Sequence, residues 1–296
     1  MRVMVIGATG TLGHRLCLDW AERFECWGTV RAPVEDPVAE LLAPVRLIAG
    51  ISAEDPDTLR SALERARPDV VVNCVGAVKQ AEEGQQPIPA IRINSLFPHE
   101  LAAACRESSA RMIHVSTDCV FSGERGRYSE QDVPDAADLY GRSKLLGEIS
   151  GEGLLTLRTS LIGRELRSSL GLLEWLISNR GGSVKGFSRA VFSGLTTIAL
   201  ASEIGVVIEE HPGLDGIWHL ASEPIDKLEL LTELERALEL GIGIVPDDSV
   251  MVDRSLDSTR LCRETGRQPR RWDQMVDELA ADATPYDEIR RKLAHR

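Results

Sequence analysis

Tyr140 and Lys144 lie four residues apart in the stretch YGRSK, and their side-chain types make them candidates for proton transfer. If the stretch is helical, this spacing places the phenol and the ammonium group on one face, about one turn apart. A free tyrosine has a pKa of about 10, and a neighbouring lysine cation favours the phenolate and lowers that pKa. The pair is therefore expected to act as an acid or base in carbonyl chemistry. The same spacing also occurs where a surface tyrosine stacks over a lysine stem.

Ser116, Thr117 and Asp118 form a second polar cluster, directly after the apolar run RMIHV. Ligands bind beyond the carboxyl ends of strands in open parallel sheets. A hydroxyl at this point can donate a hydrogen bond to a substrate carbonyl as negative charge develops on its oxygen. The same residue types are also common in turns and helix caps. Asp118 fits either a contact that orients a substrate or a cap on the next turn.

Gly7, Gly10 and Gly13 follow a short apolar stretch, Val3–Ile6, at the start of the sequence. This order predicts a strand, a glycine-rich turn and a helix. Glycines allow the backbone to approach a pyrophosphate closely, and the following helix offers unpaired amides and the positive end of its dipole. The GxxGxxG spacing therefore predicts a dinucleotide-binding loop, although such a turn can also simply end a strand.

Arg31 stands at the end of the second predicted strand, Phe24–Val30, in the sequence TVRAP. An acidic residue at this position binds the ribose diol of NAD, whereas an arginine can contact the 2′-phosphate of NADP through two hydrogen bonds. Arg31 therefore favours NADP(H) over NAD(H). An exposed loop arginine without a ligand is the alternative.

Strand-like and helical segments alternate through the first half of the chain. Further strands are predicted at Val45–Ala49, Asp69–Val75 and Arg111–Ser116, and helices at 57–69, ending at Pro68, and at 93–109. This alternation predicts an α/β fold, namely a doubly wound parallel sheet of the NAD(P)-binding Rossmann type with a smaller C-terminal substrate lobe.

Strand-like and helical segments alternate less regularly after a predicted sixth strand near residue 160. Residues 1–160 are expected to form the NAD(P)-binding domain and residues 161–296 mainly a substrate-binding lobe, with 190–215 returning to the first domain. Helical patterns recur at 196–210, 225–240 and 272–281.

The composition of the chain limits the classes of partner that it is expected to bind. The chain has 34 basic and 46 acidic residues, a net charge of −12, and only 4% aromatic residues, which disfavours binding to nucleic acid or anionic membranes. No long apolar span or signal peptide is apparent, so we expect a cytoplasmic protein. Six cysteines without CxxC spacing predict reduced thiols and no metal site.

These motifs together resemble the extended short-chain dehydrogenase/reductase superfamily, and within it the dTDP-4-dehydrorhamnose reductase group of sugar-nucleotide reductases. The resemblance covers about the first two thirds of the chain. Its matching segments are GATGTLG, INSLFPHELAAAC, STDCVFSG, YSEQDVPDAADLYGRSKLLGE, LRTSLIG and FSGLTT.

The resemblance implies an NADPH-dependent reduction of the C4 ketone of a nucleoside-diphosphate 4-keto-6-deoxy sugar, a step in deoxysugar biosynthesis. Thr117 would polarise the carbonyl, Tyr140 would donate the proton, and Lys144 would hold the nicotinamide ribose. Asn94 would support the site from the helix behind it. The other residues implied at the cofactor are Gly7, Thr9, Gly10, Thr11, Leu12, Arg31, Cys74, Val75, Gly76 and Ser116.

The sequence departs from the group's pattern near the expected sugar site. Cys119 stands where the group usually has tyrosine, and Leu161 where it often has an aromatic residue. The sugar is therefore left open. Candidate substrate contacts are Lys79, Asp118, Cys119, Phe121 and Arg189.

Two other functions are compatible with the same motifs. One is a sugar-nucleotide epimerase of the superfamily, which would favour tightly held NAD. The other is a non-catalytic NADP-binding regulatory subunit, since the group resembles a partner of methionine adenosyltransferase. A homodimer is possible in any of these cases.

Overall fold

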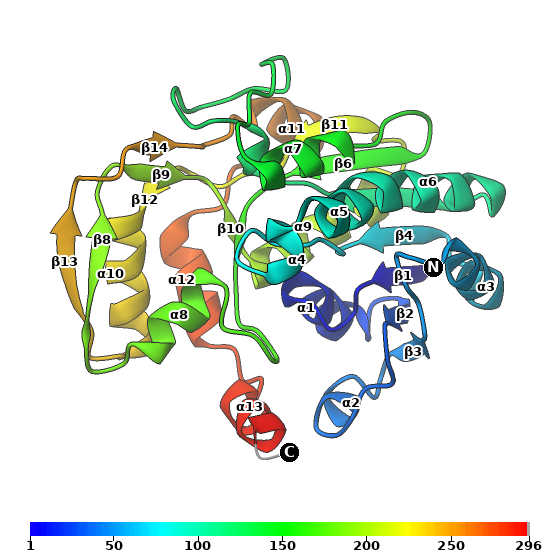
Figure 1. Ribbon diagram of the computed structural model, residues 1–296, viewed down its shortest axis with the longest axis horizontal. Coiled ribbons are helices and arrows are strands. Elements are labelled where there is room, and N and C mark those ends of the chain that lie inside the picture. The colour runs from blue at the N-terminus through cyan, green and yellow to red at the C-terminus, as the bar shows by residue number, and fades with distance from the viewer. Residues whose placement is uncertain (295–296) are drawn as a thin grey trace.

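A seven-stranded parallel sheet forms the larger part of the molecule in the computed structural model, which describes residues 1–294 (Figure 1). The strand order is β3-β2-β1-β4-β5-β6-β11. All six pairings are parallel, which confirms the predicted doubly wound α/β fold. The strands are β1 (Arg2–Ile6), β2 (Glu25–Val30), β3 (Arg46–Ala49), β4 (Val70–Asn73), β5 (Arg111–Val115), β6 (Leu154–Arg158) and β11 (Gly216–His219).

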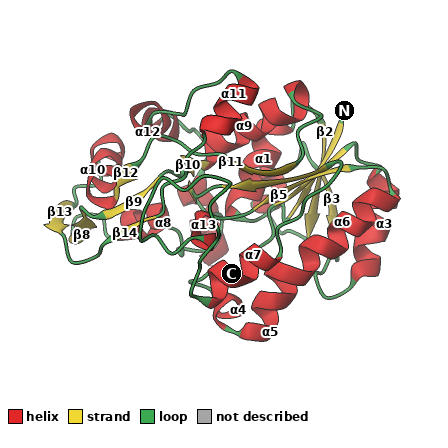
Figure 2. Ribbon diagram, turned by 90° about the horizontal axis from the view of Figure 1, so that it is seen from above, coloured by secondary structure: helices red, strands yellow, loops and turns green. Residues whose placement is uncertain are grey.

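Helices cover both faces of this sheet, as Figure 2 shows. The helices α1 (Thr11–Trp20) and α9 (Thr197–Glu210) pack together against one face, and α3 (Pro56–Ala66) and α6 (Phe97–Glu107) against the other. Strands covered on both sides are mostly apolar, and β4 is buried at every residue. Shorter helices connect the strands: α2 (Val38–Leu41), α4 (Glu82–Gln85), α5 (Pro87–Ala90) and α7 (Leu139–Leu146).

Two predicted helices differ from the observed ones at their ends. The helix expected to end at Pro68 stops at Ala66, because Arg67 takes a left-handed conformation with φ 45°. The single helix expected over 93–109 begins instead as a π-helical segment, Ile91–Leu96, that continues into α6. Such wide turns are frequent at functional sites, and this one carries Asn94.

The C-terminal part of the chain adds small sheets and helices on one side of the large sheet (Figure 1). The chain also returns to the large sheet, since α9 packs on α1 and β11 pairs with β6. The strands are β7 (Leu161–Ile162), β8 (Ser183–Phe187), β9 (Ala190–Phe192), β10 (Leu195–Thr196), β12 (Ile225–Asp226), β13 (Gly243–Asp247) and β14 (Val252–Asp253). The helices are α8 (Leu172–Ser178), α10 (Lys227–Leu238), α11 (Thr259–Thr265), α12 (Trp272–Ala280) and α13 (Tyr286–Ala294).

None of the helices within residues 1–294 combines the length and the apolar character needed to cross a membrane. Over the same residues, no group of three or more His, Cys, Asp or Glu side chains is arranged to hold a metal ion.

A buried ion pair fixes the carboxyl end of β6 against the segment that follows α7. Arg158 Nε and Nη2 donate to the two Glu148 carboxylate oxygens at 2.8 and 2.7 Å, and each side chain is only 4% exposed. Ser116 Oγ donates to the same carboxylate at 2.8 Å. Glu148 therefore links β5, β6 and α7.

Replacing Glu148 by alanine is expected to lower the free energy of unfolding by about 3–5 kcal/mol, because Arg158 would remain buried without its partner. Urea unfolding followed by circular dichroism measures this change. Glu152→Ala, at an exposed position nearby, is the control and should change stability by less than about 0.5 kcal/mol. Equal stability of the two variants would contradict the assignment.

Candidate functional site

The sequence motifs meet at the carboxyl edge of the large sheet. Gly7 follows β1, Cys74 follows the neighbouring β4, and Ser116 follows β5. The order of the strands reverses between β1 and β4. From β1 the chain builds β2 and β3 on one side, and it then returns to build β4, β5 and β6 on the other. Ligands bind at this switch point in doubly wound sheets.

The glycine-rich turn has the geometry of a phosphate cradle. Gly7 has φ +88°, a conformation that side chains rarely adopt, and Gly10 N donates to Gly7 O at 3.0 Å. A Cβ on Gly13 would overlap the carbonyl oxygen of Gly7, so only glycine lets α1 approach β1 this closely. No side chain caps the N-terminus of α1 at Gly10, which leaves its first amides available to an anion.

A cavity of about 520 Å³ lies over this turn. Arg31 is on its wall, exposed, and makes no ion pair among the described residues. Seven of the residues predicted at a cofactor line the cavity: Gly7, Thr9, Gly10, Arg31, Cys74, Val75 and Gly76. Glycine amides, an open helix end and an arginine suit the diphosphate and phosphate groups of a nicotinamide dinucleotide.

Six of the predicted cofactor residues do not line the cavity; Asn94, Tyr140 and Lys144 are described below, and Thr11, Leu12 and Ser116 have structural contacts. The Leu12 side chain is buried in the core, Thr11 Oγ1 donates to Glu165 Oε1 at 3.4 Å, and the Ser116 hydroxyl is bound to Glu148. Leu12 and Thr11 remain at the first turn of α1, so their backbone amides rather than their side chains face an anion there.

Asn94 connects the cavity to α7. Its side chain is fully buried, with Oδ1 accepting from Ala77 N at 2.8 Å and Nδ2 donating to Ala77 O at 3.0 Å. Nδ2 also donates to Ser143 Oγ at 3.0 Å. Asn94 therefore holds the loop after β4 against the helix that carries Tyr140 and Lys144, a supporting role from behind the site.

Tyr140 reaches Thr117 because α7 packs very closely on the loop after β5. A Cβ on Gly141 would overlap the carbonyl oxygen of Cys119, so a glycine is required at this contact. Asp138 caps the helix by accepting from Gly141 N at 2.8 Å. The Tyr140 phenol lies near the Thr117 side chain, close enough for hydrogen bonding to lower the pKa of the phenol.

The Tyr140 phenol has a raised pKa, opposite in direction to the sequence prediction. Burial is the largest cause, with Cys119, Asp118 and Asp138 acting in the same direction, while the Thr117 hydrogen bond lowers it. The predicted lowering by Lys144 is therefore wrong for this structure, because desolvation of the phenolate dominates. The phenol stays protonated near neutral pH, as a proton donor requires.

Lys144 is buried between β5 and the cavity. Its Nζ donates to Val115 O at 2.9 Å, and a Cβ on Gly76 would lie 3.9 Å from the same Nζ. Burial lowers its pKa to about 8, and Glu148 opposes that shift. The ammonium thus faces the Gly76 edge of the cavity, and only one of its three donors is used by Val115.

The substrate candidates near Thr117 have distinct surroundings. Asp118 is buried, and burial raises the pKa of its carboxyl group, against the opposing charges of Arg254 and Lys227. Cys119 is half-buried, and burial raises the pKa of its thiol to about 12. Lys79 Nζ donates to the Asp138 carboxylate at 2.7 Å, so its charge lies at the start of α7.

Two substrate candidates are not positioned for direct contact. Phe121 is fully buried and stacks on Tyr128 with ring centroids 4.2 Å apart. Arg189 lies in the turn between β8 and β9, where its guanidinium contacts Met251. The prediction for Phe121 is wrong because the ring belongs to the core, and Arg189 does not line the cavity.

Lys227 was not predicted from sequence. It is the first residue of α10, yet its Nζ lies 3.6 Å from the centroid of the Phe192 ring and near Asp118 and Cys119. Burial lowers its pKa to about 8. A cation in the first turn of a helix is electrostatically unfavourable, and this is the one sequence signal that could have drawn attention to it.

Two known proteins with related sequences each match half or more of this chain. A probable dTDP-4,6-dihydroxy-2-methyloxan-3-one 4-ketoreductase of Streptomyces antibioticus is 32% identical over 74% of this chain and 70% of its own length. A dTDP-4-keto-6-deoxy-D-glucose reductase of Streptomyces niveus is 35% identical over 50% of this chain, and there the match spans only 46% of the relative.

Solved structures share the fold over nearly the whole chain. A hypothetical dTDP-4-dehydrorhamnose reductase from Sulfolobus tokodaii is 26% identical, with a TM-score of 0.76, covering 92% of this chain and 98% of its own. Two others share the fold alone. A dTDP-4-dehydrorhamnose reductase from Bacillus anthracis in complex with NADP has 19% identity, a TM-score of 0.76 and coverage of 94% and 98%. WbmG of Bordetella bronchiseptica in complex with NAD and UDP has 18% identity and a TM-score of 0.75, and the match covers 94% of this chain and 92% of WbmG.

The family profile described as the RmlD substrate binding domain matches residues 1–171, more than half of the chain and all of the sheet-edge site described above. The fold, the site geometry and this match lead to one conclusion: the chain belongs to the RmlD family.

Proposed function

We propose that this protein reduces the C4 ketone of a nucleoside-diphosphate 4-keto-6-deoxy sugar with NADPH. The observation that carries the proposal is the closeness of the Tyr140 phenol to the Thr117 side chain, with the Lys144 ammonium on the same helix near Gly76, which lines a cavity suited to a dinucleotide. Two relatives named as 4-ketoreductases or reductases of dTDP-linked sugars support the substrate class.

Each residue has a defined task in this reduction. A nicotinamide bound beside these residues would supply the hydride for the carbonyl carbon. Thr117 and Tyr140 donate hydrogen bonds to the carbonyl oxygen, and the Tyr140 proton passes to that oxygen to complete the alcohol. The Lys144 ammonium, near Gly76 at the edge of the cavity, would hold the nicotinamide ribose, and a proton from solvent restores the phenol.

Cofactor selection follows from Arg31. An exposed guanidinium on the wall of the cavity, without an ion-pair partner among residues 1–294, suits the 2′-phosphate of NADPH. Since relatives with the same fold bind NADP or NAD, the choice in this chain depends on local residues such as this one.

Lys227 and Arg254 supply positive charge on the substrate side. Both lie close enough to Asp118 to lower its pKa, and neither forms an ion pair within 4.0 Å among residues 1–294. Arg254 Nε donates to Phe121 O at 3.0 Å, and Lys227 packs on Phe192. A nucleoside diphosphate or another anionic group would provide the partner that these half-buried cations lack.

The alternatives are less well supported. An epimerase of the superfamily would favour NAD, whereas Arg31 favours NADP. A regulatory subunit would need only cofactor binding, whereas the site also keeps a protonated phenol in contact with a second hydroxyl, which binding alone does not require.

Tyr140→Phe is expected to lower kcat by about a hundredfold or more, because the proton donor is lost while the ring is retained. NADPH oxidation followed at the nicotinamide absorbance, with dTDP-, UDP- and GDP-linked 4-keto-6-deoxy sugars, measures this. NADPH affinity should remain near wild type. A variant as active as wild type would refute the assigned role, and tight NADPH binding without turnover on any substrate would favour the regulatory function.

Arg31→Ala is expected to weaken NADPH binding by about tenfold and leave NADH binding nearly unchanged, because only NADPH carries the 2′-phosphate. Fluorescence titration with each cofactor gives the ratio of affinities. The assignment of Arg31 fails if that ratio stays the same.

Lys227→Met is expected to raise the KM for the nucleotide sugar by about tenfold with little change in kcat. In the wild type, KM should also rise as pH increases through about 8, since Lys227 loses its charge there, and the variant should lack that rise. Lys185→Met, at an exposed lysine paired with Asp247 in the same lobe, is the control. A pH dependence of KM that persists in Lys227→Met would exclude Lys227 as its source.

A further inference from the structure

One wall of the cofactor cavity comes from a segment that no motif predicts. Arg167 and Ser168 line the cavity together with the glycine-rich turn and Arg31. They belong to residues 164–171, here called the strap, which connects β7 to α8. Two sets of contacts, one within the strap and one with α13, hold this segment in place beside the cavity.

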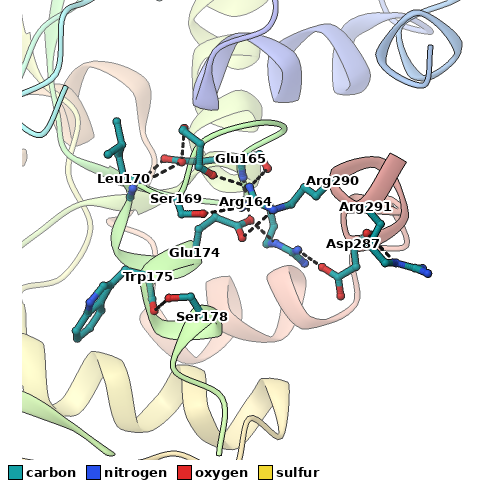
Figure 3. Close-up of polar contacts among 12 residues, drawn as sticks. Arg164, Glu165, Ser169, Leu170, Glu174, Trp175, Ser178, Asp287, Arg290 and Arg291 are labelled. Carbon is teal, nitrogen blue, oxygen red and sulfur yellow. Dashed lines mark hydrogen bonds and ion pairs between the residues drawn. The ribbon is translucent and has the colours of Figure 1, made fainter. Parts of the chain in front are cut away.

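The carboxylate of Glu165 closes the strap on itself. It is 5% exposed and accepts from Ser168 Oγ at 2.5 Å, from Leu170 N at 3.2 Å and from Gly171 N at 3.0 Å (Figure 3). The same carboxylate accepts from Thr11 Oγ1 of α1 at 3.4 Å. These bonds fix the turn of the strap and join it to the helix behind the glycine-rich loop.

The helix α13 holds the strap from outside. Arg290 Nη1 donates to the carbonyl oxygens of Glu165 and Ser168 at 2.8 and 2.5 Å, and Nη2 donates to Ser169 Oγ at 2.6 Å (Figure 3). Arg164, at the start of the strap, pairs with Asp287 of α13 at 2.5 Å. A planar guanidinium that donates to two carbonyls and a hydroxyl leaves the backbone of the strap little freedom.

The same helix also contacts α1, the helix that follows the glycine-rich turn. Tyr286 Oη and His14 Nε2 are 2.9 Å apart, and His14 Nδ1 is 2.8 Å from the carbonyl oxygen of Gly10. Burial lowers the His14 pKa to about 4, so the ring is neutral near neutral pH. Nδ1 must then donate to Gly10, and Nε2 accepts from the Tyr286 hydroxyl. Because α13 contacts both the strap and, through His14, the glycine-rich loop, it fixes the distance between them.

The arginines of this region are not equivalent. Arg164 and Arg290 are engaged in the contacts above, whereas the Arg167 guanidinium is exposed and forms no hydrogen bond or ion pair within residues 1–294. An unpaired guanidinium on the wall of a cavity that also holds Arg31 and an open helix end is matched to a phosphate oxygen.

We infer that Arg167 is a cofactor-binding residue that contacts a phosphate of the dinucleotide, and that Arg290 is a positioning residue that holds the strap where Arg167 can make this contact. The inference rests on the cofactor part of the proposed function and is independent of the sugar. It assigns a positioning role to α13, which lies outside the part matched by the family profile.

The test is a fluorescence titration with NADPH on the full chain, comparing Arg167→Gln, Arg290→Met and the double variant. Arg167→Gln should weaken binding about tenfold, and Arg290→Met by a smaller factor of the same sign. In the double variant the effect of Arg290→Met should vanish, because a positioning residue has no effect once the positioned side chain is gone. Arg291→Gln is the matched control, since Arg291 Nε donates only to Asp287 O of its own helix.

Thermal unfolding without cofactor separates positioning from loss of structure. Arg167→Gln should unfold at the same temperature as the wild type, because the Arg167 guanidinium has no hydrogen-bond or ion-pair partner in the described part of the chain. The inference would be overturned if Arg167→Gln bound NADPH as tightly as the wild type. It would also be overturned if the losses of affinity from Arg167→Gln and Arg290→Met simply added in the double variant. In both cases the wild type would still bind the cofactor. A wild type that binds neither NADPH nor NADH would overturn the proposed function and this inference together.

Discussion

The close contact between α7 and the loop after β5 is the constraint on which the site depends. Gly141 packs on the carbonyl oxygen of Cys119 with no space for a side chain, and this brings the Tyr140 phenol to Thr117. Asn94, bonded to Ala77 and to Ser143, fixes the other side of α7 against the cavity. A reacting carbonyl can therefore meet a donor pair that is already assembled, which reduces the reorganisation that catalysis requires.

Desolvation controls the chemistry of this assembly. Burial raises the pKa of Tyr140 and lowers that of Lys144 to about 8; both values still lie above neutral pH, so both groups keep their proton there. Lys227 experiences the same desolvation on the substrate side. Half-buried cations without ion-pair partners fit a site built for anionic ligands, since phosphate groups supply the missing charges.

Much of the fold and part of the site could be predicted from local signals. The five strands expected in the first half of the chain are present within two residues of their predicted ends, because buried parallel strands are continuous apolar runs. The glycine-rich turn was recognisable since its spacing reflects close approaches that only glycine allows. The π-helical turn at Asn94 was not, because it depends on packing against α7.

The sequence alone determined the Rossmann-type sheet, the glycine loop and the identity of Thr117, Tyr140 and Lys144 as candidates, because these follow from periodicity and short spacings. Tertiary structure decided which side chains face the ligands. It buried Phe121, reversed the expected pKa shift of Tyr140, and brought Lys227 and Arg167 to the site from distant segments. Burial and long-range proximity arise only when the chain is packed, so no local pattern encodes them.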